Sequence, residues 1–173
     1  INKVDTANPD DVIAVRESLF ALNPTAQVIE AASPIYVDDP DAIRGKRVLV
    51  VEDGPTLTHG GMAFGAGYVA ARRYGAAEIV DPRPFAVGSI VDTYKKYPGT
   101  GKILPAMGYG EQMVRDLEQT INNADVDMVV IGTPIDLNRI MKINKPTQRV
   151  RYALEEIGKP TPVSYTHLTL PTT

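Results

Sequence analysis

The chain has 173 residues, of which 43% are hydrophobic and 23% are charged, and its formal net charge is −3. This is the composition of an ordinary globular protein with a buried core, and the mild acidity excludes a general attraction to nucleic acid or to membranes. The sequence has no cysteine, which excludes disulfides, thiolate metal sites and cysteine nucleophiles. Because no apolar run approaches the roughly 20 residues of a membrane-spanning helix, we expect a cytoplasmic protein.

The motif Asn2-Lys3-Val4-Asp5 follows the apolar Ile1 and has the N-K-x-D pattern with which P-loop GTPases bind a nucleotide base. An Asp carboxylate accepts two parallel hydrogen bonds from the edge of a guanine-like ring, while Asn and Lys brace the loop and cover the ring. The alternative is a chance match in a turn before a helix. Such a motif comes late in a nucleotide-binding domain. We therefore expect the Gly-rich phosphate loop and the Mg²⁺ ligands upstream, in a longer protein of which this chain is the C-terminal portion.

Residues 1–45 are predicted to be the C-terminal end of that P-loop NTPase domain. Asn8 precedes Pro9 and two acidic residues, which is typical of a capped helix start, and apolar residues then recur at helical spacing up to residue 22. Residues 27–31 predict a short strand. The polar connection at residues 38–45 marks a boundary.

Residues 46–162 are predicted to form a second, Rossmann-like α/β unit that binds the substrate. The continuous apolar runs at residues 47–51 and 127–131 are typical of strands that are covered on both faces. Further strands are predicted at 77–80 and 148–154, and helices at 61–74, 89–97, 111–122 and 136–141. This alternation predicts an α/β fold with a mostly parallel sheet and flanking helices.

Polar loops follow three of these strands, beginning at Glu52, Asp81 and Gly132. Ligands of parallel sheets bind beyond the carboxyl ends of the strands, so we expect the loops to line one substrate pocket. The candidate catalytic residues are Asp53, His59 and Arg83, and the candidate substrate-binding residues are Thr56, Thr58, Gly60, Gly61, Asp136, Lys145 and Arg149.

In this interpretation Arg83 and His59 neutralise the phosphates of a substrate, and Asp53 orients a metal ion or water. Backbone N–H groups at the helix start that follows Gly60 and Gly61 hold an anion. The alternatives are structural: a turn capped by Asp53, a buried histidine, a surface salt bridge of Arg83 and a solvated basic face. A lone histidine does not indicate a metal site, so no metal ligands are predicted in this chain.

Residues 163–173, VSYTHLTLPTT, have neither helical nor strand periodicity. They resemble the translated read-through of a transposase sequencing adapter, and we expect a non-native tail. The alternative is a natural, polar, disordered tail.

Several long motifs occur in order along residues 1–162: INKVD, EAASPI, KRVLVVEDGPTLTHGGM, YGAAEIVDPRPFAVGSI, LPAMGYG, VVIGTPIDL and INKPTQRVRYALEEIGKPT. In these motifs the chain resembles the cyclic 2,3-diphosphoglycerate synthetase family, whose members are often described as predicted GTPases. The resemblance implies a larger ligase that uses ATP (or GTP) and Mg²⁺ to close 2,3-diphosphoglycerate into an intramolecular phosphoanhydride. It also implies that Asn2, Lys3 and Asp5 are the base-binding motif and that Ala31, Ala32 and Ser33 form the next base-contacting loop.

The implied partner is a small anionic phosphorylated substrate. Binding to nucleic acid or to a membrane is not expected, and a homodimer is one possible assembly. Without the upstream part, this portion alone is expected to be inactive. Two other functions are considered: a regulatory GTPase switch that binds a protein partner, and a metallochaperone-like nucleotide hydrolase. The lack of cysteine and the few histidines argue against the second within this chain.

Overall fold

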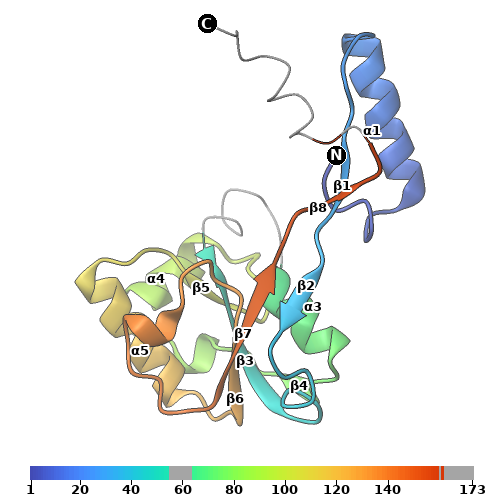
Figure 1. Cartoon of the computed structure of the whole chain (residues 1–173). Coiled ribbons are helices and arrows are strands. Elements are labelled where there is room, and N and C mark those ends of the chain that lie inside the picture. Colours follow the sequence, from blue (N-terminus) through green and yellow to red (C-terminus); the bar gives the residue numbers. More distant parts are fainter. Residues whose placement is uncertain (55–63, 160, 162–173) are drawn as a thin grey trace, which may run out of the picture. The chain divides into compact units, whose positions relative to one another are not determined.

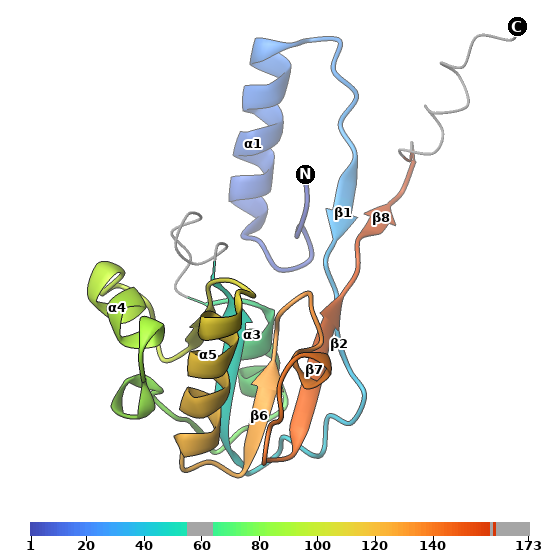
Figure 2. The same cartoon turned by 90° about the vertical axis from the view of Figure 1, so that its left-hand side faces the viewer.

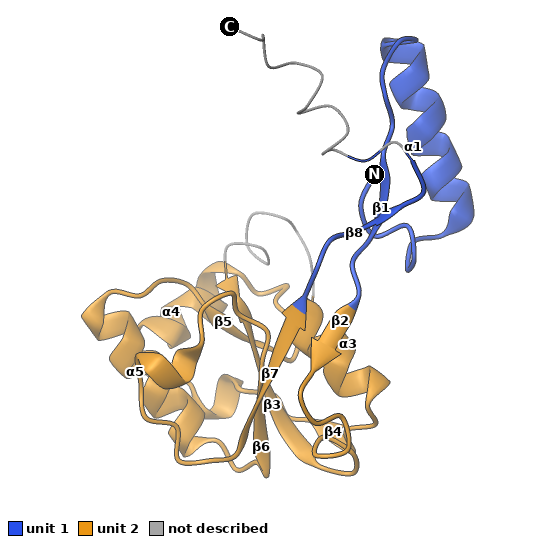
Figure 3. Cartoon of the chain, in the orientation of Figure 1, with its two compact units in different colours: residues 1–34, 152–173 blue, residues 35–151 orange. Residues whose placement is uncertain are grey.

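The computed structural model describes residues 1–54, 64–159 and 161 (Figure 1). Figure 3 shows its two compact units, one made of residues 1–34 with the segment from Tyr152 onward and the other of residues 35–151. Within the described residues, no helix is both long and apolar enough to cross a bilayer.

The first unit contains α1 (Pro9–Leu22), β1 (Glu30–Ala32) and β8 (Glu155–Ile157). The predicted start of the helix is confirmed, because Asn8 is the N-cap and its side chain accepts a hydrogen bond from the Asp10 N–H. β1 pairs with β8 in antiparallel fashion, and a parallel bridge joins Asn2 to Ala31 on the same strand. This pairing brings together two segments that lie far apart in the sequence, which the sequence pattern did not indicate.

The apolar face of α1 stays open to solvent. None of its residues is buried, and Leu22 is 86% exposed. Most of the stability of a protein helix comes from packing of its apolar face rather than from helix propensity. Among the helices and strands that the structure describes, we therefore expect local opening to be easiest in α1.

We expect the backbone amides of α1 to exchange with solvent at least about 10-fold faster than those of β3 (Arg47–Asp53) in this chain, because only the strand is packed on both faces. Native-state hydrogen exchange measures both elements in one experiment. Equal protection of α1 and β3 would contradict this expectation.

The second unit is built on a sheet with the strand order β2-β7-β6-β3-β4, and β5 pairs with the carboxyl-terminal half of β3. Its strands, besides β3, are β2 (Ile35–Val37), β4 (Glu78–Ile79), β5 (Leu104–Ala106), β6 (Met128–Ile131) and β7 (Thr147–Tyr152). β3 is parallel to β4, β5 and β6, and β6 is parallel to β7. The predicted mostly parallel α/β sheet is confirmed for this unit.

Helices cover both faces of this sheet (Figure 2). They are α3 (Ala66–Arg73), α4 (Ser89–Lys96) and α5 (Glu111–Asn123), with short 3₁₀ turns η1 (Arg83–Phe85) and η2 (Leu137–Arg139). Alternate residues of β3 divide the core: Leu49 and Val51 pack with α4 and α5, while Val48 and Val50 pack with α3. The run RVLVV is continuous because both faces of the strand are buried.

The short strands β2, β5 and β8 were not predicted. β5 contains Pro105 and has only three residues, so it lacks both a period and a β-forming composition. Of the expected helix at 61–74, the described part begins at Ala66. The tail at 163–173 lies outside the described residues.

Candidate functional site

The two predicted base-binding segments lie against each other in the first unit. Asn2 forms a parallel bridge with Ala31, and the Val4 N–H donates to the Ala31 carbonyl at 3.2 Å. The Ser33 N–H donates to Asp5 Oδ1 at 3.0 Å. The structure thus joins the N-K-x-D loop to the loop formed by residues 31–33, and the Asp5 carboxylate is the link between them.

Lys3 has a left-handed backbone with φ of 63°, the only positive φ among the described non-glycine residues. The Lys3 N–H donates a hydrogen bond to Asn2 Oδ1 at 2.8 Å, and the Lys3 carbonyl accepts hydrogen bonds from the N–H groups of Thr6 and Ala7. A left-handed non-glycine residue costs of the order of 1–3 kcal/mol and is enriched at ligand-binding loops. The tight turn leaves the Lys3 side chain exposed beside Asp5.

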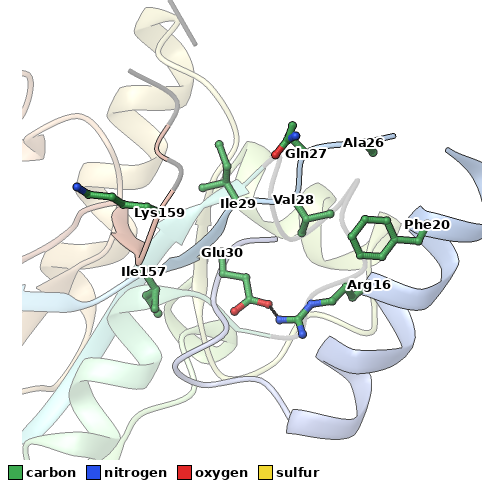
Figure 4. A pocket seen from close by; sticks show the side chains of 9 residues that line it. All are labelled: Arg16, Phe20, Ala26, Gln27, Val28, Ile29, Glu30, Ile157 and Lys159. Carbon is green, nitrogen blue, oxygen red and sulfur yellow. Dashed lines mark hydrogen bonds and ion pairs between the residues drawn. The ribbon is translucent and has the colours of Figure 1, made fainter. Parts of the chain in front are cut away.

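An open hollow of about 460 Å³ lies elsewhere in the first unit, between α1 and the segment that leads into β1 (Figure 4). Figure 4 shows Arg16 and Glu30 pointing toward each other across it, and the two side chains form an ion pair. Phe20 and Val28 give it an apolar wall. None of the described residues that line it belongs to the predicted sites, so it adds no support to them.

In the second unit, Asp53 ends β3 and lies opposite Ala106 of β5. The next residue, Gly54, has no room for a side chain, because a Cβ there would lie 2.5 Å from the Met107 sulfur. The loop after β5 continues to Tyr109, whose pKa is raised by burial and by the negative charge of Asp53. Tyr109 is 40% exposed. It is a candidate contact residue at this edge that the sequence analysis missed, although it stands between two glycines before a helix.

The loop after β6 brings two more predicted residues to the carboxyl edge. Asp136 caps η2 by accepting the Asn138 N–H at 3.1 Å. Arg149 lies on β7 opposite Ile131, and its Nη2 donates to the Pro134 carbonyl at 2.8 Å. Its buried Nε makes no hydrogen bond with any described residue. Arg149 is therefore a cation that is held in place at this edge by the Pro134 carbonyl.

Glu52 lies at the same end of β3 and is only 2% exposed. Its Oε1 accepts the Tyr68 N–H at 2.8 Å, and the N–H groups of Gly67 and Gly65 also contribute. Burial raises the pKa of Glu52 to about 7; the backbone N–H groups oppose this shift, and Asp53 adds to it. The start of α3 is thus occupied by a carboxylate of the chain itself, whereas Gly60 and Gly61, where the anion-binding helix start was expected, lie outside the described residues.

Arg83 is engaged by protein groups. Its Nη1 donates to Asp81 Oδ2 at 2.9 Å, its Nη2 bonds to the Thr100 carbonyl, and its guanidinium lies 5.2 Å from the centre of the Tyr94 ring. The surface salt bridge that was the alternative for Arg83 is present. Its role toward substrate phosphates stays a prediction.

Lys145 does not lie at the carboxyl edge. It precedes β7, and its Nζ donates to the Asn122 carbonyl at the end of α5 and to Asn144 Oδ1, both at 2.9 Å. Because β7 runs parallel to β6, residues before β7 lie at the amino edge of the sheet. Of the two basic residues that were predicted to bind the substrate, Arg149 therefore lies at the carboxyl edge and Lys145 at the amino edge.

Five predicted residues lie outside the described residues: Thr56, Thr58, His59, Gly60 and Gly61. In the part of the chain that the structure describes, no three His, Asp or Glu side chains converge as metal ligands. At the carboxyl edge, the structure therefore combines Asp53, Tyr109, Asp136 and Arg149 with the buried Glu52. Among these groups, Arg149 is suited to pairing with an anionic group, and Asp53, Tyr109 and Asp136 are suited to hydrogen bonds with a polar molecule.

The chain is similar to the protein named arginine synthetase ArcE from Thermococcus kodakarensis, with 68% identity over 160 residues. The aligned residues cover 92% of this chain but 36% of that relative, so the chain spans little more than a third of the relative's length. No family model matches the chain, and no solved structure matches it. The chain is thus similar, along nearly all of its length, to part of a protein that is named a synthetase.

Proposed function

We propose that this chain is part of an ATP-dependent synthetase that forms arginine. The observation that carries the proposal is the 68% identity over 160 residues to a protein of that name. The geometry of the first unit supports a nucleotide-dependent activity, because Asp5 joins the N-K-x-D loop to residues 31–33. A carboxylate can accept several hydrogen bonds, so Asp5 is able to hold Ser33 and the edge of a base together.

The chemistry of the product defines the task. The guanidinium carbon of arginine carries three nitrogens, so a synthetase that completes it replaces a ureido oxygen with nitrogen. That oxygen is a poor leaving group until the γ-phosphoryl group of ATP is transferred to it, with loss of ADP. A nitrogen nucleophile then attacks the carbon and expels phosphate. We assign Mg²⁺ to the nucleotide phosphates and the binding of the substrate carboxylate to Arg149, since such transfers depend on positioning and charge neutralisation.

A second candidate reaction is the closure of 2,3-diphosphoglycerate into an intramolecular phosphoanhydride. The motifs along residues 1–162 favour it, since they resemble the family that carries this activity. Both reactions begin with phosphoryl transfer to a substrate oxygen. ADP leaves in this first step, and the reactions differ in the group that then expels phosphate, which is a nitrogen nucleophile in one and a phosphate oxygen of the substrate in the other.

The full-length protein distinguishes these candidates when it is incubated with ATP and Mg²⁺ and ADP release is followed. We expect ADP release to require a ureido amino acid with ammonium, and arginine to form in equal amount. A requirement for 2,3-diphosphoglycerate would support the second candidate. Nucleotide cleavage that no small substrate stimulates would contradict both and favour a regulatory GTPase.

Replacing Asp5 by alanine in the full-length protein is expected to weaken nucleotide binding by about 10- to 100-fold, because a hydrogen bond to a charged group contributes roughly 1.5–3 kcal/mol. Titration calorimetry with ATP and GTP measures the effect. Asp5→Asn keeps an oxygen for the Ser33 N–H but presents N–H₂ to the base, so it should change the preference between ATP and GTP.

Asp11→Ala is the matched control, since Asp11 is an exposed carboxylate of the same unit on the first turn of α1. It should leave both affinities unchanged. If Asp5→Ala and Asp5→Asn bind ATP and GTP as the wild type does, the N-K-x-D loop has no role in base binding.

A further inference from the structure

Glu52 has surroundings that only glycine residues allow. A Cβ at Gly65 would lie 2.5 Å from Glu52 Oε2, and a Cβ at Gly132 would lie 2.4 Å from the same atom. At Gly67 the nearest atoms would be Glu52 Oε1 and Val50 Cγ1, both at 3.1 Å. Three glycines, at the N-cap of α3, in its first turn and directly after β6, thus surround one carboxylate.

The carboxylate also links three elements of the fold. It belongs to β3, it accepts the Tyr68 N–H at the start of α3, and it lies against Gly132, whose N–H donates to the Val51 carbonyl at 2.8 Å. Gly132 opens the loop that carries Asp136 and the Pro134 carbonyl bound by Arg149. A shift of the Glu52 carboxylate would therefore displace the ends of β3 and β6 together.

A buried carboxylate is costly unless its oxygens are well bonded, and a leucine or methionine would fill the same volume without that cost. Backbone N–H groups at a helix start offset part of the free-energy cost of burying the carboxylate. The geometry explains how the charge is tolerated, but packing alone does not require a charge at this position. Its position directly before Asp53 places it behind the edge that carries the proposed substrate contacts.

We propose that Glu52 is a positioning residue of the carboxyl-edge site: its carboxylate binds the amides at the start of α3 and holds the ends of β3 and β6 in the arrangement that the reaction requires. This proposal rests on the proposed synthetase function. Glu52 does not contact the substrate; it acts through Asp53 and through the loop that begins at Gly132.

The contact itself is tested in this chain by a double-mutant cycle of Gly65→Ala and Glu52→Ala. All three nearest neighbours of a Cβ at Gly65 are Glu52 side-chain atoms. Gly65→Ala should therefore lower the melting temperature by about 4 °C or more with Glu52 present and by less than about 1 °C in the Glu52→Ala background. Gly110→Ala is the matched control, because Gly110 is also an N-cap and has no atom within 4 Å of the added Cβ. Additive effects of the two changes would overturn the proposal.

The positioning role is tested with Glu52→Gln, which keeps the shape but presents N–H₂ to N–H donors. In this chain, amide exchange at Gly67, Tyr68 and Gly132 should become about 10-fold faster. In the full-length protein, Glu52→Gln and Gly65→Ala should each lower kcat about 10-fold or more and leave the nucleotide KM within about twofold, while Gly110→Ala changes neither.

An unchanged kcat in both variants would overturn the positioning role even if the double-mutant cycle shows coupling. If the wild-type protein has no synthetase activity, the proposed function fails. Amide exchange then still decides for Glu52: unchanged exchange at the start of α3 and at Gly132 overturns the proposal, and faster exchange at both supports it.

Discussion

Replacing Arg149 by alanine is expected to lower kcat/KM of the full-length protein about 100-fold or more. Arg149 is held by the Pro134 carbonyl at the carboxyl edge. A charge-assisted hydrogen bond contributes roughly 1.5–3 kcal/mol, so the loss of such a bond to the substrate carboxylate, together with the positive charge, gives an effect of this size. Steady-state kinetics with varied substrate measures it.

Lys145→Ala is the control for this experiment. Lys145 is a cation close to Arg149 in the sequence, but its side chain bonds to the Asn122 carbonyl at the amino edge of the sheet. This control variant should leave kcat/KM within about twofold of the wild type. Arg149→Lys should recover only part of the activity, because an ammonium lacks the planar pair of donors. Equal activity of Arg149→Ala and the wild type would show that the substrate binds elsewhere.

Glu52 should make the stability of this chain depend on pH between about 4.5 and 7. Its pKa is raised from 4.5 in the unfolded chain to about 7 in the fold, so the native state holds the proton more tightly. The favourable contribution of the neutral acid is fully present below pH 4.5 and is lost as the pH rises through about 7. The difference between the two pKa values corresponds to about 3 kcal/mol.

The measurement is urea unfolding of the wild type and of Glu52→Gln at several pH values. The free energy of unfolding of the wild type, minus that of the variant, should fall as the pH rises across this window, because residue 52 titrates only in the wild type. The pKa of Asp116 is lowered by bonds from Ser89, and its contribution to stability is lost below pH 3.8, outside the window. If the difference in unfolding free energy between wild type and variant stays constant from pH 4.5 to 7, the pKa of Glu52 is not raised by burial.

The central part of the fold follows from local sequence patterns. Strands β3 and β6 are continuous apolar runs, and the cap of α1 by Asn8 is a side-chain effect within two residues. Partners that lie far apart in sequence leave no such pattern. The pairing of β1 with β8 joins Glu30 to Ile157, and β5 is defined by its pairing with β3 rather than by its three residues.

The candidate sites were predictable to a similar degree. The motif at Asn2–Asp5 and the segment 31–33 are recognisable as short sequences, and the structure brings them together through Ser33. The position of Lys145 was not predictable from its closeness to Arg149 in the sequence, because β7 carries the chain from the amino edge of the sheet, where Lys145 lies, to the carboxyl edge, where Arg149 lies. Glu52 was overlooked as a site residue because its environment is made by Gly65, Gly67 and Gly132, which lie at the start of α3 and after β6, far apart in the sequence.

The proposed activation of a substrate oxygen by ATP has a direct tracer test in the full-length protein. A ureido amino acid labelled with ¹⁸O at the ureido oxygen is incubated with ATP, Mg²⁺ and ammonium, and the released phosphate is analysed by mass spectrometry. The synthetase proposal predicts one ¹⁸O atom in the phosphate for each arginine formed. Phosphate that is released without label, while the ureido compound keeps its ¹⁸O and no arginine appears, would contradict it.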